Sequence, residues 1–155
     1  MGKNAKKERV VRSMENVQVM RNIFSAIECR DTQRFRELVH PDVEMHWPAS
    51  LPYGGTARGL TPEEPTWSAT WIPLQPSAAE RRMDPRVVAA SAEEVVVLWR
   101  QRGVTPAGDR CDEEVLGLYH VRGGKLTRAQ MFYFDTAAVV RFLAKAMGQA
   151  TAPQP

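Results

Sequence analysis

Residues 94–134 read EVVVLWRQRGVTPAGDRCDEEVLGLYHVRGGKLTRAQMFYF, and this stretch carries most of the strand signal in the chain. Its apolar and β-branched runs predict three strands, at residues 94–104, 114–122 and 126–134. A turn at Pro106-Ala107-Gly108-Asp109 separates the first two strands, and Gly123-Gly124 forms a tight turn before the third. Strands that follow one another through such turns pair in antiparallel orientation. The stretch therefore predicts an antiparallel sheet as the framework of the fold.

Two helices and a short strand are predicted upstream of this sheet. From Ser13 to Cys29 the apolar residues recur at helical spacing and form one stripe, made of Val17, Met20, Phe24 and Ile27. Asp31 has the form of an N-cap for a second helix, Thr32 to Val39, which Pro41 ends. Residues 43–47 then alternate in character, which predicts a short strand with Val43, Met45 and Trp47 on one face.

The segments around the long sheet complete the pattern. Residues 48–59 are predicted to form a loop that carries Tyr53, and a short helix is expected to start at Thr61 or Pro65 and to end near Ile72, with Trp67 and Trp71 on one face. Residues 81–90 are predicted to form a strand at a sheet edge or bulge, because Pro85 lies in the middle of them. Asp135 is expected to cap a last helix, Thr136 to Met147.

Together these elements predict an α+β fold. A strongly curved antiparallel sheet wrapped on the helices would bury every apolar stripe described above. No internal repeat and no linker interrupt the pattern. We therefore expect a single domain over residues 13–148, preceded by a disordered basic N terminus, residues 1–12, and followed by a flexible tail, residues 149–155.

The composition narrows the class of protein. The chain has 155 residues, of which 43% are hydrophobic and 25% charged, with 21 Lys and Arg against 18 Asp and Glu. A net charge of +3 is too small to indicate nucleic-acid binding, and part of it lies in the N-terminal residues Lys3, Lys6, Lys7, Arg9 and Arg12. Cys29 and Cys111 are too far apart for a zinc knuckle or a redox motif, so we expect reduced thiols in a cytoplasmic protein. No apolar stretch approaches the roughly 18 residues of a membrane span.

Five segments carry a family resemblance: LVHPDVEMHWP (38–48), GTARG (55–59), EVVVLW (94–99), VRGGKL (121–126) and YFDTAA (133–138). Their order and spacing resemble the nuclear transport factor 2-like superfamily, and more narrowly its SnoaL-like and ketosteroid-isomerase-like branch, over roughly residues 14 to 145. The resemblance implies a cone-shaped barrel of strongly curved antiparallel sheet around the N-terminal helices, closed by a C-terminal helix. It also implies a cavity between sheet and helices and a homodimer formed through the sheet.

The known catalytic residues of this branch are missing from the matching positions. Ketosteroid isomerases use a carboxylate base with a tyrosine and a protonated carboxylic acid. The base position falls on Trp47, the tyrosine position on Ile23 and the acid position on Gly117. The acid–base positions of SnoaL-type aldol cyclases fall on Gly117 and Met131. The resemblance therefore implies the scaffold and carries over neither catalytic set.

If the resemblance holds, strand alternation assigns a wall to the cavity. Met131 and Tyr133 would face it from the last strand, Gly117 and Tyr119 from the strand before, and Trp47 from the first strand. This predicts an aromatic, apolar pocket suited to a flat hydrophobic ligand. Two interpretations of the phenols stay open: Tyr119 and Tyr133 donate hydrogen bonds to a substrate oxygen, or they are core aromatics with local partners.

Four further groups are candidates, each with a structural alternative. His46 is a candidate general acid or base, because imidazole titrates near neutral pH, although alternation points it away from Trp47. Asp135 either reaches the mouth of the pocket or only caps the last helix. Tyr53 either closes over a ligand or is a surface aromatic. Trp67 and Trp71 either line the cavity or anchor their short helix to the core.

These observations favour an enzyme without metal or organic cofactor. It would act on a hydrophobic polyketide- or terpenoid-like intermediate by ring closure, isomerisation, dehydration or epoxide opening, with Tyr and His as acid–base groups. The alternative is a non-catalytic domain of the same fold that binds a small molecule or a protein. A third and weaker hypothesis is docking of nucleic acid or protein on the basic N terminus. We expect a homodimer and neither a nucleic-acid nor a membrane partner.

Overall fold

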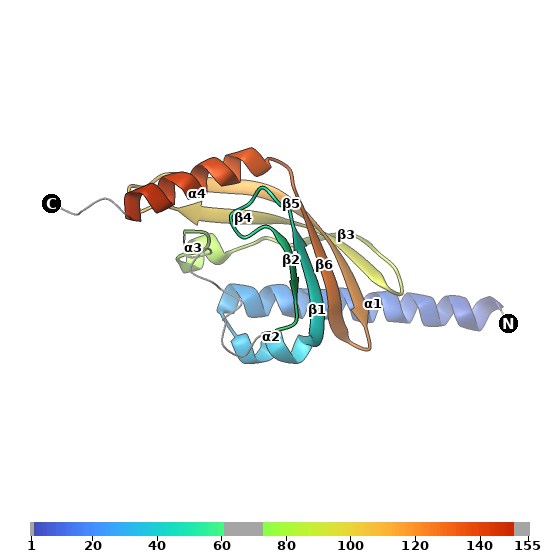
Figure 1. Cartoon of the computed structure of the whole chain (residues 1–155). Helices are drawn as coiled ribbons and strands as arrows, with labels where there is room; N and C mark the ends of the chain where they lie inside the picture. The colour runs from blue at the N-terminus through green and yellow to red at the C-terminus, as the bar shows by residue number, and fades with distance from the viewer. Residues whose placement is uncertain (1, 61–72, 151–155) are drawn as a thin grey trace.

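The computed structural model describes residues 2–60 and 73–150, and they form a curved sheet covered by helices (Figure 1). In chain order the elements are α1 (Gly2–Cys29), α2 (Thr32–Leu38), β1 (Val39–Trp47), β2 (Gly55–Arg58), α3 (Ala78–Arg81), β3 (Arg86–Ala90), β4 (Glu94–Val104), β5 (Arg110–Arg122), β6 (Lys125–Tyr133) and α4 (Thr136–Ala150). Helices α1 and α2 pack on one face of the sheet, which we call the inner face. Helix α4 lies across one end of the strands, and the predicted α+β fold class is confirmed.

The sheet has six strands in the order β2-β1-β6-β5-β4-β3 and does not close into a barrel. All neighbouring strands are antiparallel except β1 and β6, which run parallel. The sheet is therefore mixed, where the sequence pattern predicts a purely antiparallel one. The parallel pair places the first and last strands side by side, with Met45 opposite Ala129. This pairing brings Trp47 into the neighbourhood of the residues that end β6.

The long strands follow the predicted alternation. Every second residue of β4 is buried, from Val95 to Gly103, and these residues face α1 or α4. The prediction for residues 94–104 is confirmed to the residue, while β5 begins four residues earlier than its predicted start at Glu114. Register aligns Val97 with Gly117 and Gly117 with Met131, so one row of inner-face residues crosses three strands.

Helix α1 is longer than its buried part requires. Met20, Ile23 and Phe24 are buried against the sheet, as their spacing predicts. The helix also continues back to Gly2 through residues 2–12, which the charge pattern assigns to a disordered segment. All of residues 2–12 are exposed, and this part of the helix extends beyond the sheet in Figure 1. Lys, Arg, Glu and Ala are good helix formers, so the helix continues without help from the core.

Two other segments differ from the sequence-based expectation. Residues 81–90 do not form one strand: the helix α3 ends at Arg81 and β3 begins only at Arg86, after Pro85. The predicted loop 48–59 contains the short strand β2, which pairs with the end of β1. Strand β2 has only four residues, three of them exposed, so its sequence carries no apolar alternation. The predicted helix between Thr61 and Ile72 lies outside the described residues.

Candidate functional site

An apolar cavity of about 80 Å³ lies between the inner face of the sheet and helices α1 and α2. Its wall is formed by Met20, Ile23, Phe24 and Ile27 of α1, Phe35 of α2, Met45 and Trp47 of β1, Met83, Trp99 of β4, Tyr119 of β5, and Leu126, Ala129 and Met131 of β6. No acidic, basic or histidine side chain belongs to this wall among the residues that the structure describes. The side chains of the wall that can donate a strong hydrogen bond are therefore Tyr119, Trp47 and Trp99.

Tyr119 is held in the cavity wall by the absence of a side chain at Gly117. A Cβ atom added at Gly117 would lie 2.1 Å from the Tyr119 hydroxyl oxygen and 2.2 Å from the ring carbon that bears it. The Tyr119 ring also meets Phe24 edge to face, with ring centroids 6.0 Å apart. Gly117 is predicted to contact the ligand, and the structure places it beneath Tyr119. Its function is to leave space for that ring.

Trp99 lies next to Tyr119 and also contacts Phe24, with ring centroids 6.2 Å apart. Its side chain is 3% exposed. The indole N–H is close enough to the Tyr119 hydroxyl to favour the ionised form of Tyr119, which offsets part of the rise in the Tyr119 pKa that burial causes. It makes no hydrogen bond of normal geometry with any described residue. A buried donor without an acceptor is uncommon in folded proteins.

A second polar group lies behind the two tryptophans, toward α4. The Tyr53 and Tyr133 hydroxyls are 2.9 Å apart, and Tyr133 donates a longer hydrogen bond, 3.4 Å, to Oε1 of Gln101. The Tyr133 ring packs against Trp99, and the Tyr53 ring packs against Trp47. Neither tyrosine belongs to the wall of the cavity. Both instead support the indole rings that do.

All three tyrosines of the chain are kept in the neutral form. Burial raises the pKa of Tyr53 to about 12, and the hydrogen bond with Tyr133 offsets only part of this effect. Burial also raises the pKa of Tyr119 and raises that of Tyr133 well above its ordinary value. A phenol that stays protonated at neutral pH is a hydrogen-bond donor and a weak acid, and it is not a base.

A spectrophotometric pH titration should show directly that the pKa values of the tyrosines are raised in the native protein. The chain contains three tyrosines, and in the unfolded chain their pKa should be about 10. At pH values where the unfolded chain already forms tyrosinate, the tyrosinate absorbance near 295 nm should stay low in the native protein. Because the unfolded state loses these protons first, the free energy of unfolding should fall as pH rises from about 10 to about 12. The same titration in urea serves as the control. A native curve that coincides with it would contradict the described burial.

Residues 20–129 match the family model of the SnoaL-like domain. The chain belongs to the SnoaL-like domain family. The match covers most of the chain and extends from the last third of α1 into β6. The predicted membership of the nuclear transport factor 2-like superfamily is thereby confirmed. No curated protein matches the chain.

Solved structures share the fold of this SnoaL-like domain. Bal32a, from a soil-derived mobile gene cassette, is 16% identical with a TM-score of 0.68, and the match covers 85% of this chain and 98% of Bal32a. TerC, co-crystallised with polyporic acid, is 20% identical with a TM-score of 0.62, over 84% of this chain and 98% of TerC. A putative SnoaL-like polyketide cyclase from Jannaschia sp. is 17% identical with a TM-score of 0.62, and the match covers 92% of this chain and 95% of the cyclase. At such identities the likeness concerns the fold.

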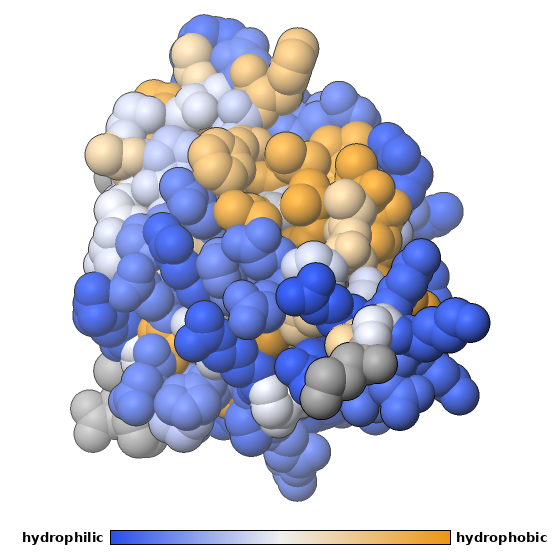
Figure 2. Space-filling view, turned by 90° about the vertical axis from the view of Figure 1, so that its right-hand side faces the viewer, coloured by the Kyte–Doolittle hydropathy of each residue, from blue (hydrophilic) through white to orange (hydrophobic). Residues whose placement is uncertain are grey.

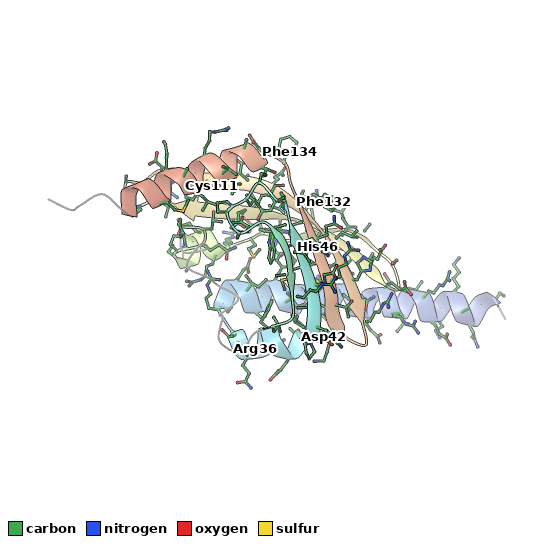
Figure 3. The ribbon with its side chains drawn as sticks, in the orientation of Figure 1. Arg36, Asp42, His46, Cys111, Phe132 and Phe134 are labelled. Atoms are coloured by element: carbon green, nitrogen blue, oxygen red, sulfur yellow. The ribbon has the colours of Figure 1, made fainter. Side chains whose placement is uncertain are left out.

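Within the SnoaL-like domain, His46 lies on the outer face of the sheet, away from the cavity (Figure 3). Its Nε2 atom is hydrogen-bonded to Glu44, and its Nδ1 atom is 3.0 Å from the Thr56 hydroxyl. The bond with His46 holds the pKa of Glu44 below its ordinary value, with help from Arg58. The direction that alternation predicts for His46 is therefore confirmed, and the histidine forms a local polar group with its neighbours.

Asp135 is also separate from the cavity. Its carboxylate accepts a hydrogen bond of 2.9 Å from the backbone N–H of Ala138 in the first turn of α4. This geometry is that of an N-cap, which is the structural alternative raised by the sequence. Trp67 and Trp71 lie outside the described residues. Of the predicted site residues, the structure thus brings Trp47, Tyr119 and Met131 to the cavity wall, with Tyr53, Tyr133 and Gly117 directly behind it.

The cavity wall also contains residues that no sequence pattern marks as site residues. Trp99 occurs in the sequence only as part of an apolar run, yet its side chain forms part of the wall. Its position in the buried register of β4 is a signal that would have found it, and the same register contains the buried polar residue Gln101. Four of the lining side chains are methionines, at positions 20, 45, 83 and 131. Methionine changes rotamer easily, so this wall adapts to the shape of an occupant.

Three further properties concern the described part of the SnoaL-like domain as a whole. None of the helices in residues 2–60 and 73–150 is long and apolar enough to cross a membrane. Over those same residues, no three His, Cys, Asp or Glu side chains come together as ligands for a metal ion. Cys29 is exposed, Cys111 is buried, and both are free thiols. Burial raises the pKa of Cys111 to about 12, so this thiol is not a nucleophile at neutral pH.

Proposed function

We propose that this protein is a cofactor-independent enzyme that binds a neutral, hydrophobic, polyketide- or terpenoid-like intermediate in the cavity and activates it by hydrogen-bond donation from Tyr119. The observation that carries the proposal is a buried, neutral phenol in a described wall that contains no charged side chain. A donor in such surroundings stabilises negative charge that develops on a substrate oxygen more than water does. Ring closure, isomerisation and dehydration that pass through an enolate, and epoxide opening to an alkoxide, all develop such charge.

The surroundings of Tyr119 support a neutral ligand. A charged ligand would lose its hydration without meeting an opposite charge in the described wall, and this loss is costly. The cavity volume of about 80 Å³ is smaller than the roughly 300–1,000 Å³ of ligand pockets in general. A larger intermediate therefore requires the four methionines of the wall to change rotamer. The family membership, and a fold neighbour described as a putative polyketide cyclase, agree with this substrate class.

The test is turnover of a panel of neutral polyketide- and terpenoid-like compounds that carry an epoxide, a β-hydroxyketone or an unsaturated ketone, followed by mass spectrometry. For a compound that is converted, Tyr119→Phe should lower kcat by about 10²–10³-fold, as for loss of one donor to a developing oxyanion. Affinity should change far less, because the ring remains. His46→Ala is the matched control and should leave kcat within about twofold, since His46 lies on the other face.

A non-catalytic ligand-binding domain is the second candidate, and one observation favours it. The described wall of the cavity contains no carboxylate or imidazole that could act as a base. Binding of panel compounds without conversion of any of them would support this candidate over the enzyme. Absence of binding by any neutral hydrophobic compound would contradict both.

We also propose that the outer face of the sheet joins two copies of the chain. Leu98, Leu116 and Phe132 lie opposite one another on adjacent strands and form an apolar row. Leu116 is 37% exposed, Phe132 48% and Phe134 86%, and Figure 2 shows apolar side chains gathered on this side of the molecule. Charges of both signs border the row, because Arg100 pairs with Asp112 on one side and Glu44 with Arg58 on the other. A face of this kind complements a copy of itself turned by 180°.

Size-exclusion chromatography with light scattering tests the dimer. The wild-type protein should show about twice the monomer mass of 17.4 kDa. In the Phe132→Arg variant the measured mass should be 17.4 kDa, because dimerisation would bury the arginine charge at the centre of the interface. Val11→Arg, an exposed position on α1 away from this face, should leave the mass unchanged. A wild-type protein that stays monomeric at high micromolar concentration would contradict the proposal.

A further inference from the structure

A second, open cleft lies where the middle of α1 passes the β3–β4 and β5–β6 turns (Figure 1). Its volume is about 600 Å³, which falls within the roughly 300–1,000 Å³ of ligand pockets in general. The cleft is lined by Arg12, Glu15 and Asn16 of α1, by Ala92 and Glu93 of the first turn, and by Val121, Arg122, Gly123 and Gly124 at the second. It shares no lining residue with the apolar cavity, so it is a separate site.

Asn16 supplies a hydrogen-bond acceptor to this cleft. The residue is 4% exposed, and it follows Met20 of the cavity wall by one turn along the same side of α1. Its Nδ2 atom donates a hydrogen bond of 3.0 Å to the backbone oxygen of Ala92 and a longer one of 3.5 Å to that of Ser91. These bonds fix the orientation of the amide, and no described residue donates to its Oδ1 atom. The largely buried amide therefore has an acceptor left for an occupant of the cleft.

Four charged side chains surround this acceptor: Arg12 and Glu15 from α1, and Glu93 and Arg122 from the turns. All four are exposed. Within the described part of the chain, none of these side chains makes a hydrogen bond or an ion pair. On the outer face, by contrast, Arg100 pairs with Asp112 at 2.6 Å. The cleft thus contains charges of both signs that do not neutralise one another.

The chemistry of an occupant follows from these groups. An anion alone would meet two carboxylates as well as the guanidinium groups, and a cation alone would meet two guanidinium groups. A compound that carries an ammonium group and a carboxylate can bring each charge to its opposite. An N–H group of the same compound can donate to the Oδ1 atom of Asn16. Amino acids and short peptides combine these three groups in one small molecule.

We propose that this cleft is a second binding site, specific for a small zwitterion of the amino-acid or short-peptide type. Arg12 and Arg122 bind its carboxylate, and Glu15 and Glu93 bind its ammonium group. Asn16 accepts a hydrogen bond from one of its N–H groups. The site does not depend on the proposed function, because it uses none of the residues of the apolar cavity.

The test uses triglycine and three blocked forms of it. Acetyl-triglycine lacks the ammonium group, triglycine amide lacks the carboxylate, and acetyl-triglycine amide lacks both. Each peptide is titrated into the full-length, ¹⁵N-labelled protein at low salt, and binding is followed by the backbone amide signals of Glu93, Gly123 and Gly124. Triglycine should bind with a Kd on the order of 1 mM, and blocking either end should weaken binding by about threefold or more, as loss of an exposed charge pair allows. Salt at about 0.5 M should weaken triglycine binding as well.

Two double variants assign each charge of the peptide to its partners. In Arg12→Gln/Arg122→Gln the preference for triglycine over triglycine amide should disappear, while the preference over acetyl-triglycine remains. In Glu15→Gln/Glu93→Gln the reverse should hold. These positions are exposed, so the variants should fold, and the amide spectrum reports this for each of them. Arg34→Gln, an exposed position on α2 outside the cleft, is the matched control and should bind all four peptides as the wild-type protein does.

The outcomes decide the proposal without reference to the cavity. Tighter binding of triglycine than of its blocked forms, with the two preferences lost separately in the two double variants, supports the zwitterion site. Equal binding of all four peptides, no binding of triglycine, or preferences that persist in both double variants would overturn it. None of these results changes the expectation for turnover in the apolar cavity, which the compound panel tests separately.

Discussion

Replacing Phe24 by alanine should lower the free energy of unfolding by about 3–5 kcal/mol, a large part of the stability of a domain of this size. Phe24 is 3% exposed and lies where α1 meets the sheet. Its ring contacts both Trp99 and Tyr119. The substitution removes these contacts and enlarges a cavity that already exists beside them, so little of the loss can be recovered by collapse. Urea denaturation followed by circular dichroism measures the change.

Met14→Ala is the matched control for this experiment. Met14 lies on the same helix but is exposed, so its replacement should change the free energy of unfolding by less than about 0.5 kcal/mol. Similar costs for the two variants would show that the stability of α1 comes from the helix itself and not from its contact with the sheet.

Gly117→Ala should lower the free energy of unfolding by about 1–3 kcal/mol, although alanine is ordinarily the better residue outside turns. The new Cβ would overlap the Tyr119 ring and hydroxyl, so that ring would have to leave its place in the cavity wall. Loss of near-ultraviolet circular dichroism from the aromatic residues should accompany the loss of stability. The kcat for any compound that is converted should also decrease, because the Tyr119 donor moves with the ring.

A double-mutant cycle assigns this cost to one contact. In a Tyr119→Leu background the ring is gone, and the change from Gly117 to alanine should then cost less than about 0.5 kcal/mol. Additive costs in the double variant would mean that the strain arises elsewhere in β5. The control variant Gly148→Ala, where an added Cβ meets nothing within 4 Å, should not destabilise the protein.

The features that could be predicted from the sequence are those that depend on local patterns. The alternation of β4 and the caps Asp31 and Asp135 involve residues close together in the chain, and each is found as predicted. The opposite directions of His46 and Trp47 also follow from alternation alone. Cavity-facing positions such as Tyr119 could be predicted for the same reason, once the family resemblance gave the side of the sheet on which the helices lie.

The features that were missed depend on contacts between distant segments or on their absence. The helix over residues 2–12 buries nothing, so no apolar stripe marks it. Strand β2 exists only because β1 offers it a partner. No local pattern shows that Tyr133 would bond to Tyr53 and Gln101 and be displaced from the cavity wall. The unpartnered donor of Trp99 appears only when every nearby acceptor is known, which requires the folded chain.

The parallel pairing of β1 with β6 has a consequence for how the protein folds. The two strands are the first and the last of the sheet in chain order, and a parallel ladder joins them. Until β6 has been synthesised, β1 has only the four-residue β2 as a neighbour, and an isolated two-stranded ribbon of this kind is marginally stable in water. Contacts of such high sequence separation slow folding, because the loop between them must be closed first. The wall that holds Trp47 beside Met131 therefore forms late, only after β6 has been synthesised.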